Sequence, residues 1–276
     1  MDAKICLIVI LYNPSEEIIH RLCRYNAEMI IVDNTPEVNI TYSDRLNAKF
    51  RYISLADNRG IACAQNVAIQ KAKELGFDYV IFFDQDSEYD IAFVEKMIEE
   101  YKEIKRQDPF IATLGPAVVD KDTNLLYKSE SSSDKLFSKV ETVISSGSVV
   151  ETAVFDVVGG LEERLFIDLV DHEWCWRAKS FGYNCYQTSR VVLPHKVGNC
   201  SKTFFGYPII LSSPIRYYYK YRNFIWMLSR RYVPLRWKIN GLIRKIVELF
   251  CVPVLAKDFR ISRYMLKGIK DGFVKK

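Results

Sequence analysis

Two carboxylates of this sequence, Asp84 and Asp86, directly follow the apolar run 79–83 and flank Gln85. An apolar run of this length is typical of a strand buried on both faces of a parallel sheet. In extended chain, residues two apart point the same way, so the two carboxylates would converge. Paired carboxylates suit a hard divalent cation that takes further ligands from water and substrate phosphates. A solvated acidic turn is the alternative, because Asp and Ser are common in turns.

A second carboxylate cluster places Asp168, Asp171 and Glu173 among aromatic residues. The pattern predicts Asp171 as the N-cap of a helix that runs to about residue 181, with Glu173 and Arg177 as an i,i+4 pair. Desolvation by Trp and Phe would raise the pKa of a carboxylate toward a useful basicity. We therefore predict that Asp171 is a general base, with a purely structural N-cap as the alternative.

Polar residues also follow the earlier apolar segments. Segments 4–11, 29–32, 50–54 and 79–83 are predicted strands, and segments 15–25, 61–75 and 91–105 are predicted helices. The polar residues at the strand ends are Asn13, Asp33, Asp57, Asn58, Asp84 and Asp86. The alternation predicts an α/β fold, a mostly parallel sheet flanked by helices. In such a sheet the strand ends line one crevice, where ligands bind.

The crevice lacks the glycine-rich fingerprints of dinucleotide and P-loop sites, so a nucleotide would be held by carboxylates and a metal ion. Ser146 and Gly147 lie between apolar flanks. That pattern permits close approach of the backbone to a sugar or phosphate, or marks a simple strand bulge.

Composition limits the class of protein. Hydrophobic residues make up 49% of 276 residues, which suffices for a packed core. The apolar run 5–12 is too short for a membrane helix and has no cleavage site, so it is predicted as a strand rather than a signal peptide. The seven cysteines form no Cys-x-x-Cys pair, which fits reduced thiols in a cytosolic protein. Three of them are predicted core residues: Cys6, Cys63 and Cys175.

Charge divides the chain at about residue 213. From residue 216 onward there are 16 Lys and Arg against three acids, although the whole chain carries only +5. We predict a catalytic domain over residues 1–213 and a basic amphipathic helical region over residues 214–276, broken at Pro253. Such helices suit an anionic membrane surface, and a helical cap with a solvated charged face is the alternative. Nucleic-acid binding by this region is a further hypothesis, which the acidic crevice disfavours.

Together the motifs resemble glycosyltransferase family 2, with its A-type nucleotide-sugar-binding fold. The matching pieces are 8–13, 31–34, 57–61 with Asn66, 84–86, 146–147 and 168–177. Within that family, segments 84–86, 166–175 and 216–223 resemble bacterial rhamnosyltransferases. The resemblance implies an inverting, Mg²⁺- or Mn²⁺-dependent transfer from a nucleoside diphosphate sugar, with dTDP-L-rhamnose favoured and a UDP-hexose as the alternative. The basic region fits a glycan acceptor linked to a polyprenyl diphosphate, used by a cytoplasmic enzyme at the inner face of the cell membrane.

The resemblance also implies roles for single residues. Asp33 would hold the pyrimidine base, and Asp171 matches the family's base. Because Val170 stands where many relatives have Glu, the base remains open between Asp171 and Asp168. The implied nucleotide-sugar site comprises Asn13, Asp33, Asp57, Asn58, Arg59, Gly60, Asn66, Asp84, Gln85, Ser146, Gly147, Asp168 and Arg222. The implied metal ligands are Asp84, Asp86 and His195, although a lone His after a strand is more often structural.

Overall fold

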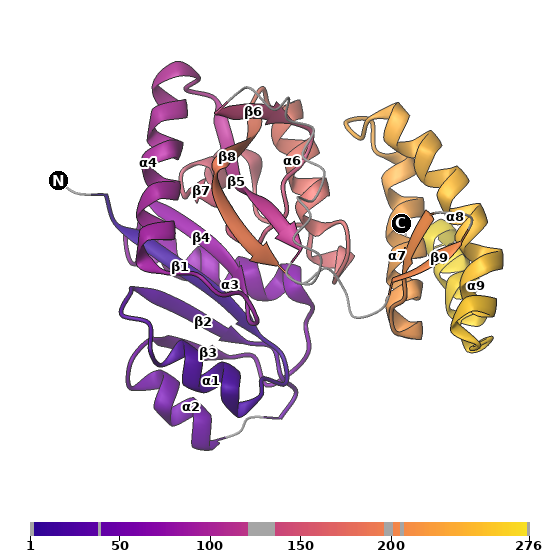
Figure 1. Ribbon diagram of the computed structural model, residues 1–276, viewed down its shortest axis with the longest axis horizontal. Helices are drawn as coiled ribbons and strands as arrows, with labels where there is room; N and C mark the ends of the chain where they lie inside the picture. Colours follow the sequence, from indigo (N-terminus) through magenta and orange to yellow (C-terminus); the bar gives the residue numbers. More distant parts are fainter. Residues whose placement is uncertain (1–2, 38–39, 121–135, 196–200, 205–206, 275–276) are drawn as a thin grey trace.

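The computed structural model describes residues 3–37, 40–120, 136–195, 201–204 and 207–274 (Figure 1). Its strands are β1 (Ile5–Leu11), β2 (Met29–Asp33), β3 (Arg51–Ser54), β4 (Tyr79–Asp84), β5 (Ile111–Asp120), β6 (Phe137–Val140), β7 (Val149–Glu151), β8 (Asn184–His195), β9 (Ser201–Phe204) and β10 (Tyr207–Ile210). Its α-helices are α1 (Glu16–Leu22), α2 (Ile40–Asn47), α3 (Ile61–Glu74), α4 (Ile91–Gln107), α5 (Val154–Val158), α6 (Val170–Ser180), α7 (Pro214–Ser229), α8 (Leu235–Ala256) and α9 (Arg260–Val274). A single 3₁₀ turn covers Glu163–Leu165.

Strands β1 to β8 form one mixed sheet in the order β3-β2-β1-β4-β7-β5-β8-β6, and β9 pairs with β10. Strands β3, β2, β1 and β4 are parallel neighbours, whereas β7 runs antiparallel to both β4 and β5. Leu11 is in register with Asp33, and Ile10 with Asp84, so the polar strand ends meet at one edge. The predicted α/β fold is confirmed, and the edge that carries the candidate site follows from the shared strand direction.

Alternate residues of β1 enter two cores on opposite faces of the sheet. Ile8 and Ile10 pack in the core that includes residues of α3, α5 and α6. Leu7 and Val9 pack in the core that includes residues of α1, α2 and α4. This alternation explains why the strand has no polar residue between Cys6 and Leu11. The three predicted core cysteines are buried: Cys6, Cys63 and Cys175.

Helix ends follow local signals, with two corrections. The Ser15 hydroxyl accepts a hydrogen bond from the Ile18 N–H at 3.4 Å, as a cap should, but α1 ends at Leu22 rather than near residue 25. Helix α2 was not predicted. Its sequence is rich in β-branched and polar residues, and over 42–47, where burial is described, the buried side chains are Tyr42 and Leu46, so its helical pattern is weak.

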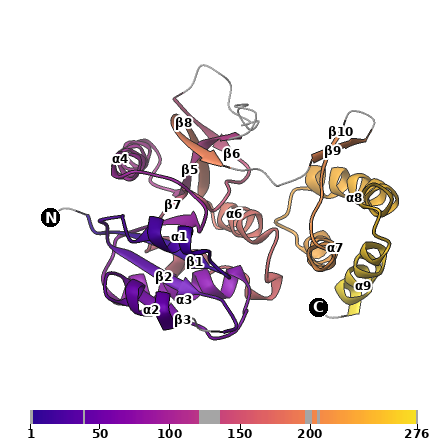
Figure 2. The same ribbon diagram turned by 60° about the horizontal axis from the view of Figure 1, so that its bottom comes forward.

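The C-terminal helices stand beside the sheet domain, with α7 nearest to it and most of α8 and α9 beyond α7 in both views (Figures 1 and 2). Trp226 and Met227 of α7 belong to the same core as Trp176 of α6, and the Trp176 and Trp237 rings lie 4.8 Å apart. Because this core is shared, the boundary at residue 213 stays a prediction. The predicted break at Pro253 is wrong, since α8 continues to Ala256 and the proline lies in its last turn. No helix among the described residues is long and apolar enough to cross a membrane.

Candidate active site

The end of β4 is held in shape by its neighbours. Gln85 Oε1 accepts a hydrogen bond from the Tyr12 N–H at 2.9 Å. The Ser87 N–H donates to the Asp84 carbonyl at 3.0 Å, which closes a turn that contains Asp86. Asp86 therefore lies in a turn, where the alternation of side chains along a strand does not apply. The prediction that Asp84 and Asp86 point the same way because they lie in extended chain is wrong. Asp84 is half-buried and Asp86 is exposed, so both remain at the open edge of the sheet.

The turn before β7 lies against the end of β4. Ser146 Oγ is 2.8 Å from Ser87 Oγ and accepts from the Asp84 N–H at 3.4 Å. Gly147 has φ +76°, and a Cβ there would lie 2.8 Å from the Pro116 ring. The turn and its packing therefore require this glycine, and neither a strand bulge nor a bound ligand is needed to explain it.

Two loops that are distant in sequence meet at Gly60. Asn34 Nδ2 donates to Asn58 Oδ1 at 3.0 Å, and the Arg59 N–H donates to Asn34 Oδ1 at 2.8 Å. Gly60 has φ +84°, and a Cβ there would lie 2.7 Å from Phe166. The loop after β3 and the loop before α6 therefore touch, as the predicted site requires. The exposed side chains at this edge are Asn13, Asp57 and Arg59.

Asp33 is engaged by the protein itself. It is 1% exposed, and its carboxylate accepts from the Thr35 N–H at 3.0 Å, the Tyr42 hydroxyl at 2.9 Å and the Tyr52 hydroxyl at 2.7 Å. Burial and the adjacent Asp33 raise the pKa of Tyr52, which keeps that hydroxyl a donor. The carboxylate is therefore occupied by hydrogen bonds within the protein. The role of Asp33 toward a pyrimidine base stays a prediction.

The segment between the 3₁₀ turn and α6 has unusual backbone geometry. Phe166, Asp168 and Leu169 each have φ +65°. Nδ2 of the fully buried Asn223 in α7 donates to the carbonyls of residues 165, 167 and 168 at 2.9, 2.7 and 2.9 Å. Conformations of this kind cost of order 1–3 kcal/mol each, persist only where surrounding contacts hold them, and cluster at functional sites.

Arg216 is the cation that faces this segment. Its Nε and Nη2 contact the Asp168 carboxylate at 2.9–3.2 Å, and 48% of its side chain is exposed against 13% for Asp168. The hydrogen bond to Asp168 raises the pKa of Arg216, and the charge of Asp84 adds to the shift. Nearby Lys220 donates to Ser212 at 2.8 Å, and burial lowers its pKa to about 8. Two basic side chains of α7 therefore lie close to Asp168, and Arg216 is also near enough to Asp84 to feel its charge.

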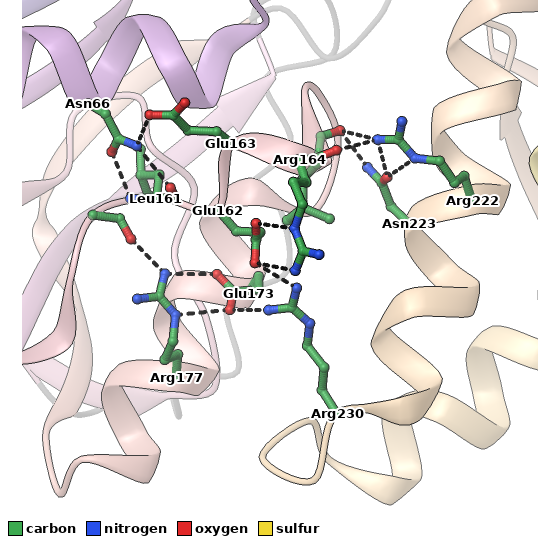
Figure 3. A network of polar contacts seen from close by, with 12 residues as sticks. Asn66, Leu161, Glu162, Glu163, Arg164, Glu173, Arg177, Arg222, Asn223 and Arg230 are labelled. Atoms are coloured by element: carbon green, nitrogen blue, oxygen red, sulfur yellow. Dashed lines mark hydrogen bonds and ion pairs between the residues drawn. The ribbon is translucent and has the colours of Figure 1, made fainter. Parts of the chain in front are cut away.

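Arg222, which the resemblance implies as part of the nucleotide-sugar site, makes its contacts elsewhere. Its Nη2 donates to the carbonyls of Arg164 at 2.6 Å and Leu165 at 3.0 Å, and its guanidinium lies 4.3 Å from the Trp226 ring (Figure 3). These contacts make Arg222 part of the support for the 166–169 segment. None of these contacts joins its guanidinium to the strand ends.

Asp171 is paired with its neighbour His172. The predicted N-cap is wrong, because α6 begins at Val170 and left-handed Leu169 occupies the cap position. Asp171 Oδ1 is 2.9 Å from both the backbone N and Nδ1 of His172. Burial favours a raised pKa for Asp171, but the charge and hydrogen bonds of His172 outweigh burial and lower it. The shift is opposite to the one that the aromatic residues alone predict, whereas the pKa of His172 is raised by Asp171 despite burial.

Asp171 also lies near β4 and the turn before β7. With Phe82, Ser145, Ser148 and other residues it lines a small cavity of about 20 Å³ beside β4 and the turn before β7.

A cavity of about 600 Å³ lies along α3 and is lined by Asn66 and Glu163. Asn66 exchanges hydrogen bonds with the Leu161 backbone at 2.7 and 2.9 Å and donates to Glu163 at 2.9 Å (Figure 3). Asn66 thus joins α3 to the loop before the 3₁₀ turn, and its role toward the nucleotide stays a prediction.

A divalent cation is compatible with the residues at the strand end. Asp84 and Asp86 supply two carboxylates at an open edge, and Mg²⁺ commonly binds one or two carboxylates plus waters and substrate phosphates. Within the described part of the chain, no three His, Cys, Asp or Glu side chains are grouped as a complete protein-only site. His195 ends β8, but its side chain lies outside the described residues, so its role as a ligand stays a prediction.

Comparison with known sequences identifies the family. Residues 6–142 match the model of Glycosyl transferase family 2. The chain is 32% identical to the dTDP-rhamnosyl transferase RfbF of Shigella flexneri over 98% of this chain and 94% of RfbF. The chain belongs to glycosyltransferase family 2. The fold and family implied by the sequence motifs are therefore confirmed.

Solved structures support the A-type fold of this transferase. TarS 1–349 of S. aureus in complex with UDP-GlcNAc has a TM-score of 0.59 at 15% identity, over 98% of this chain and 80% of that one. GalNAc-T7 with UDP, GalNAc and Mn²⁺ has a TM-score of 0.56 at 12% identity, over 92% of this chain and 57% of that one. A longer TarS chain matches with a TM-score of 0.53 at 16% identity, and the transferase spans 44% of its length.

Two residues of the candidate site escaped the sequence analysis of the transferase. His172 was overlooked because neighbours along a helix do not normally face each other, whereas here the imidazole turns back to Asp171. Arg216 lay within the recognised 216–223 segment, but Arg222 was chosen from it. The helical period gives a signal that could have found Arg216. Arg216 and Lys220 are four residues apart, so they share one side of α7, whereas Arg222 lies on another side.

Proposed function

We propose that this transferase moves an L-rhamnosyl group from dTDP-L-rhamnose to a hydroxyl of a glycan acceptor, with inversion, in the synthesis of a cell-surface polysaccharide. The carrying observation is the similarity to the dTDP-rhamnosyl transferase RfbF over nearly the whole of both chains. The meeting of the strand ends with the 166–171 segment supports the same proposal, because donor and acceptor must be held side by side.

In this proposal Asp171 is the general base. The lowered pKa keeps its carboxylate ionised at neutral pH. The backbone N–H and the imidazole of His172 both contact Oδ1, and Oδ2 is the oxygen that accepts the proton of the acceptor hydroxyl. The acceptor oxygen then bonds to the anomeric carbon as the bond to the diphosphate breaks, and the configuration inverts. His172 orients the carboxylate, as the third group of a catalytic constellation commonly does.

Asp84 and Asp86 would hold Mg²⁺ or Mn²⁺ in this proposal. When bound, the cation neutralises charge on the leaving diphosphate. Arg216 adds a positive charge from the protein, and its contact with Asp168 keeps the guanidinium at the mouth of the crevice. In this arrangement Asp168 is a less suitable base than Asp171, because its carboxylate is already occupied by Arg216.

We further propose that the acceptor is a glycan linked to a polyprenyl diphosphate, and that the transferase works as a peripheral cytoplasmic protein at the inner face of the cell membrane. The excess of basic residues beyond residue 215 supports this proposal. Cytoplasmic leaflets are negatively charged, and a cationic region draws the protein toward them.

Thermal unfolding with added ligands tests the function. A ligand that binds only the folded state stabilises it, by about 2.7 kcal/mol at a concentration of 100 times its dissociation constant. We expect dTDP and dTDP-L-rhamnose to raise Tm in the presence of Mn²⁺ and to do so less in EDTA. Asp86→Asn should remove the metal-dependent part of the increase, whereas the exposed control Asp156→Asn should keep it.

The nucleotide panel separates the alternatives. An increase in Tm with UDP alone would retain the reaction type but replace the donor with a UDP-hexose. No increase with dTDP, UDP, GDP or CMP would contradict the proposal. Binding of labelled RNA or DNA by the basic region would then be tested by its salt dependence.

A further inference from the structure

Helix α8 turns its apolar side chains outward rather than into the protein. Eight of them have 44–70% of their surface exposed: Leu235, Ile239, Leu242, Ile243, Ile246, Val247, Phe250 and Val254. Their spacing places them on one side of the helix, which we call the α8 face. The opposite side packs on α7 through Gly241, where a Cβ would lie 2.5 Å from the Phe224 ring.

This orientation reverses the usual one for a surface helix. The buried side of α8 carries Lys245, whose side chain is 11% exposed and lies 2.6 Å from Glu248. The helical cap with a solvated charged face, one of the two sequence interpretations, does not describe α8. A continuous apolar surface of this kind marks an interaction site, because scattered single residues would not share one side.

Exposed basic residues are abundant in the same helical region as the α8 face. Exposed Lys and Arg side chains on α8, the following turn and α9 are Arg236, Arg244, Lys257, Arg260, Arg263, Lys267 and Lys270. The three acids of this region are engaged: Glu248 with Lys245, Asp258 with Arg260, and Asp271 with the Tyr218 hydroxyl. The net charge of α8, the following turn and α9 is therefore positive.

The turn between α8 and α9 continues the same surface pattern. Phe259 is 72% exposed and lies next to the ion pair of Asp258 and Arg260, two residues after Lys257. An exposed aromatic ring close to basic residues suits the boundary between lipid headgroups and acyl chains. In Figures 1 and 2 most of α8 lies on the far side of α7 from the sheet, so a flat partner could meet it without touching the crevice-bearing domain.

We propose that the α8 face docks the protein onto an anionic lipid bilayer, with its apolar side chains in the headgroup region and the basic residues on lipid phosphates. The positive charge of the C-terminal helices favours an anionic lipid surface over a second copy of the chain. A twofold dimer through this face would bring two positively charged helical regions together, whereas anionic lipid neutralises such a region. The inference rests on the proposed work at the inner face of the membrane, but it is independent of the donor sugar.

Flotation of the full-length protein with vesicles tests the docking. One set contains phosphatidylethanolamine and phosphatidylglycerol, and the other contains phosphatidylcholine alone. We expect the wild type to float with the anionic set at low salt and to be released by high salt. Ile246→Ser with Phe250→Ser should lower the bound fraction at least tenfold. The matched control is Ile91→Ser with Phe110→Ser, which removes exposed apolar side chains of the same kinds from the sheet domain and should bind like the wild type.

Charge is tested separately with Arg263→Gln, Lys267→Gln and Lys270→Gln combined, which should weaken binding to the anionic vesicles. Failure of the wild type to float with anionic vesicles would overturn the proposal. A wild-type dimer that the Ile246→Ser, Phe250→Ser pair converts to monomer without vesicles would also overturn it, because a second copy would then cover the face. The Tm increase with dTDP, measured on the same variants, separates a failure of docking from a failure of the proposed function.

Discussion

At the scale of single residues, the pair Asp171–His172 determines how the proposed base behaves. Burial and the adjacent imidazole act in opposite directions on the carboxylate, and the imidazole prevails. A carboxylate that stays ionised over a wide pH range is always available as a base, although it is weaker than one with a raised pKa. Orientation by His172 then matters more than basicity.

Replacement of Asp171 by Asn keeps the shape of the side chain but removes the proton acceptor. We expect Asp171→Asn to lower kcat by roughly 10²–10⁴-fold, the usual contribution of general-base help. The Tm increase with dTDP and Mn²⁺ should be unchanged, since donor binding is assigned to other residues. A variant with nearly wild-type kcat would exclude Asp171 as the base and redirect attention to Asp168.

The pH dependence tests the role of His172. Because the imidazole lowers the pKa of Asp171, its removal should let that pKa rise. We therefore expect His172→Gln to move the acidic limb of the kcat/KM profile to higher pH. His20→Gln, an exposed histidine of α1, is the control and should leave the profile in place. An unshifted acidic limb in His172→Gln would show that Asp171 does not set it.

Arg216 is expected to contact the donor's diphosphate. We predict that Arg216→Gln weakens dTDP binding on the order of tenfold, as loss of a hydrogen bond to a charged group does, and leaves thymidine binding unchanged. Calorimetric titration with both ligands measures the difference, with the exposed Arg106→Gln as control. Equal losses for dTDP and thymidine would point to a disturbed fold rather than a lost phosphate contact.

The sequence predicted that the polar residues after β1, β2, β3 and β4 meet at one edge of the sheet. This was possible because the alternation of strands and helices implies parallel strands, whose carboxyl ends lie at the same edge. It could not predict the partners of those residues. Asp33 is buried by Tyr42, which lies on the helix that the pattern did not reveal. Arg222 and Arg216 are chemically equivalent in the sequence, and only the packing of α7 exposes one and encloses the other.

At the scale of elements, α6 and the C-terminal helices are joined by buried charge (Figure 3). Glu173 of α6 is fully buried and contacts Arg177 at 2.9 Å and Arg230, just after α7, at 2.7 Å. Arg230 also contacts Glu162 at 2.9 Å, and together with Arg164 it lowers the pKa of Glu162 to about 2 against the opposing effect of burial. The sequence predicted the i,i+4 pair of Glu173 and Arg177. It could not predict that Arg230, 57 residues away, also contacts Glu173.

Loss of Arg230 should weaken the attachment of the C-terminal helices. Removing one partner of a buried ion pair typically costs 3–5 kcal/mol, and Arg177 remains to offset part of that loss. We expect Arg230→Met to lower the free energy of unfolding by about 3 kcal/mol in urea. Arg45→Gln breaks the exposed pair with Glu16 and should produce no measurable change. Equal midpoints for both variants would contradict a structural role for the buried pair.

At the scale of the whole molecule, the sheet and the C-terminal helices are packed together, and Asn223 of α7 holds the 166–169 segment of the candidate site. The division at residue 213 matches a change in charge but not a separation of cores, because Trp226 packs with Trp176. Composition revealed the basic character of the C-terminal region. It could not reveal which side of α8 faces outward, since that depends on where a glycine lets two helices approach.

The strand order also bears on how the protein is made. Strands β1 to β4 and their helices are synthesised first, and apart from β7 they pair only with one another. Because domains fold as units and N-terminal parts emerge from the ribosome first, the edge with Asp33 and Asp84 can assemble on the nascent chain. The 166–169 segment is held by Asn223, which is translated well after that segment. A ribosome stalled before Asn223 would hold a chain that carries the strand-end edge but lacks the contacts that hold the 166–169 segment.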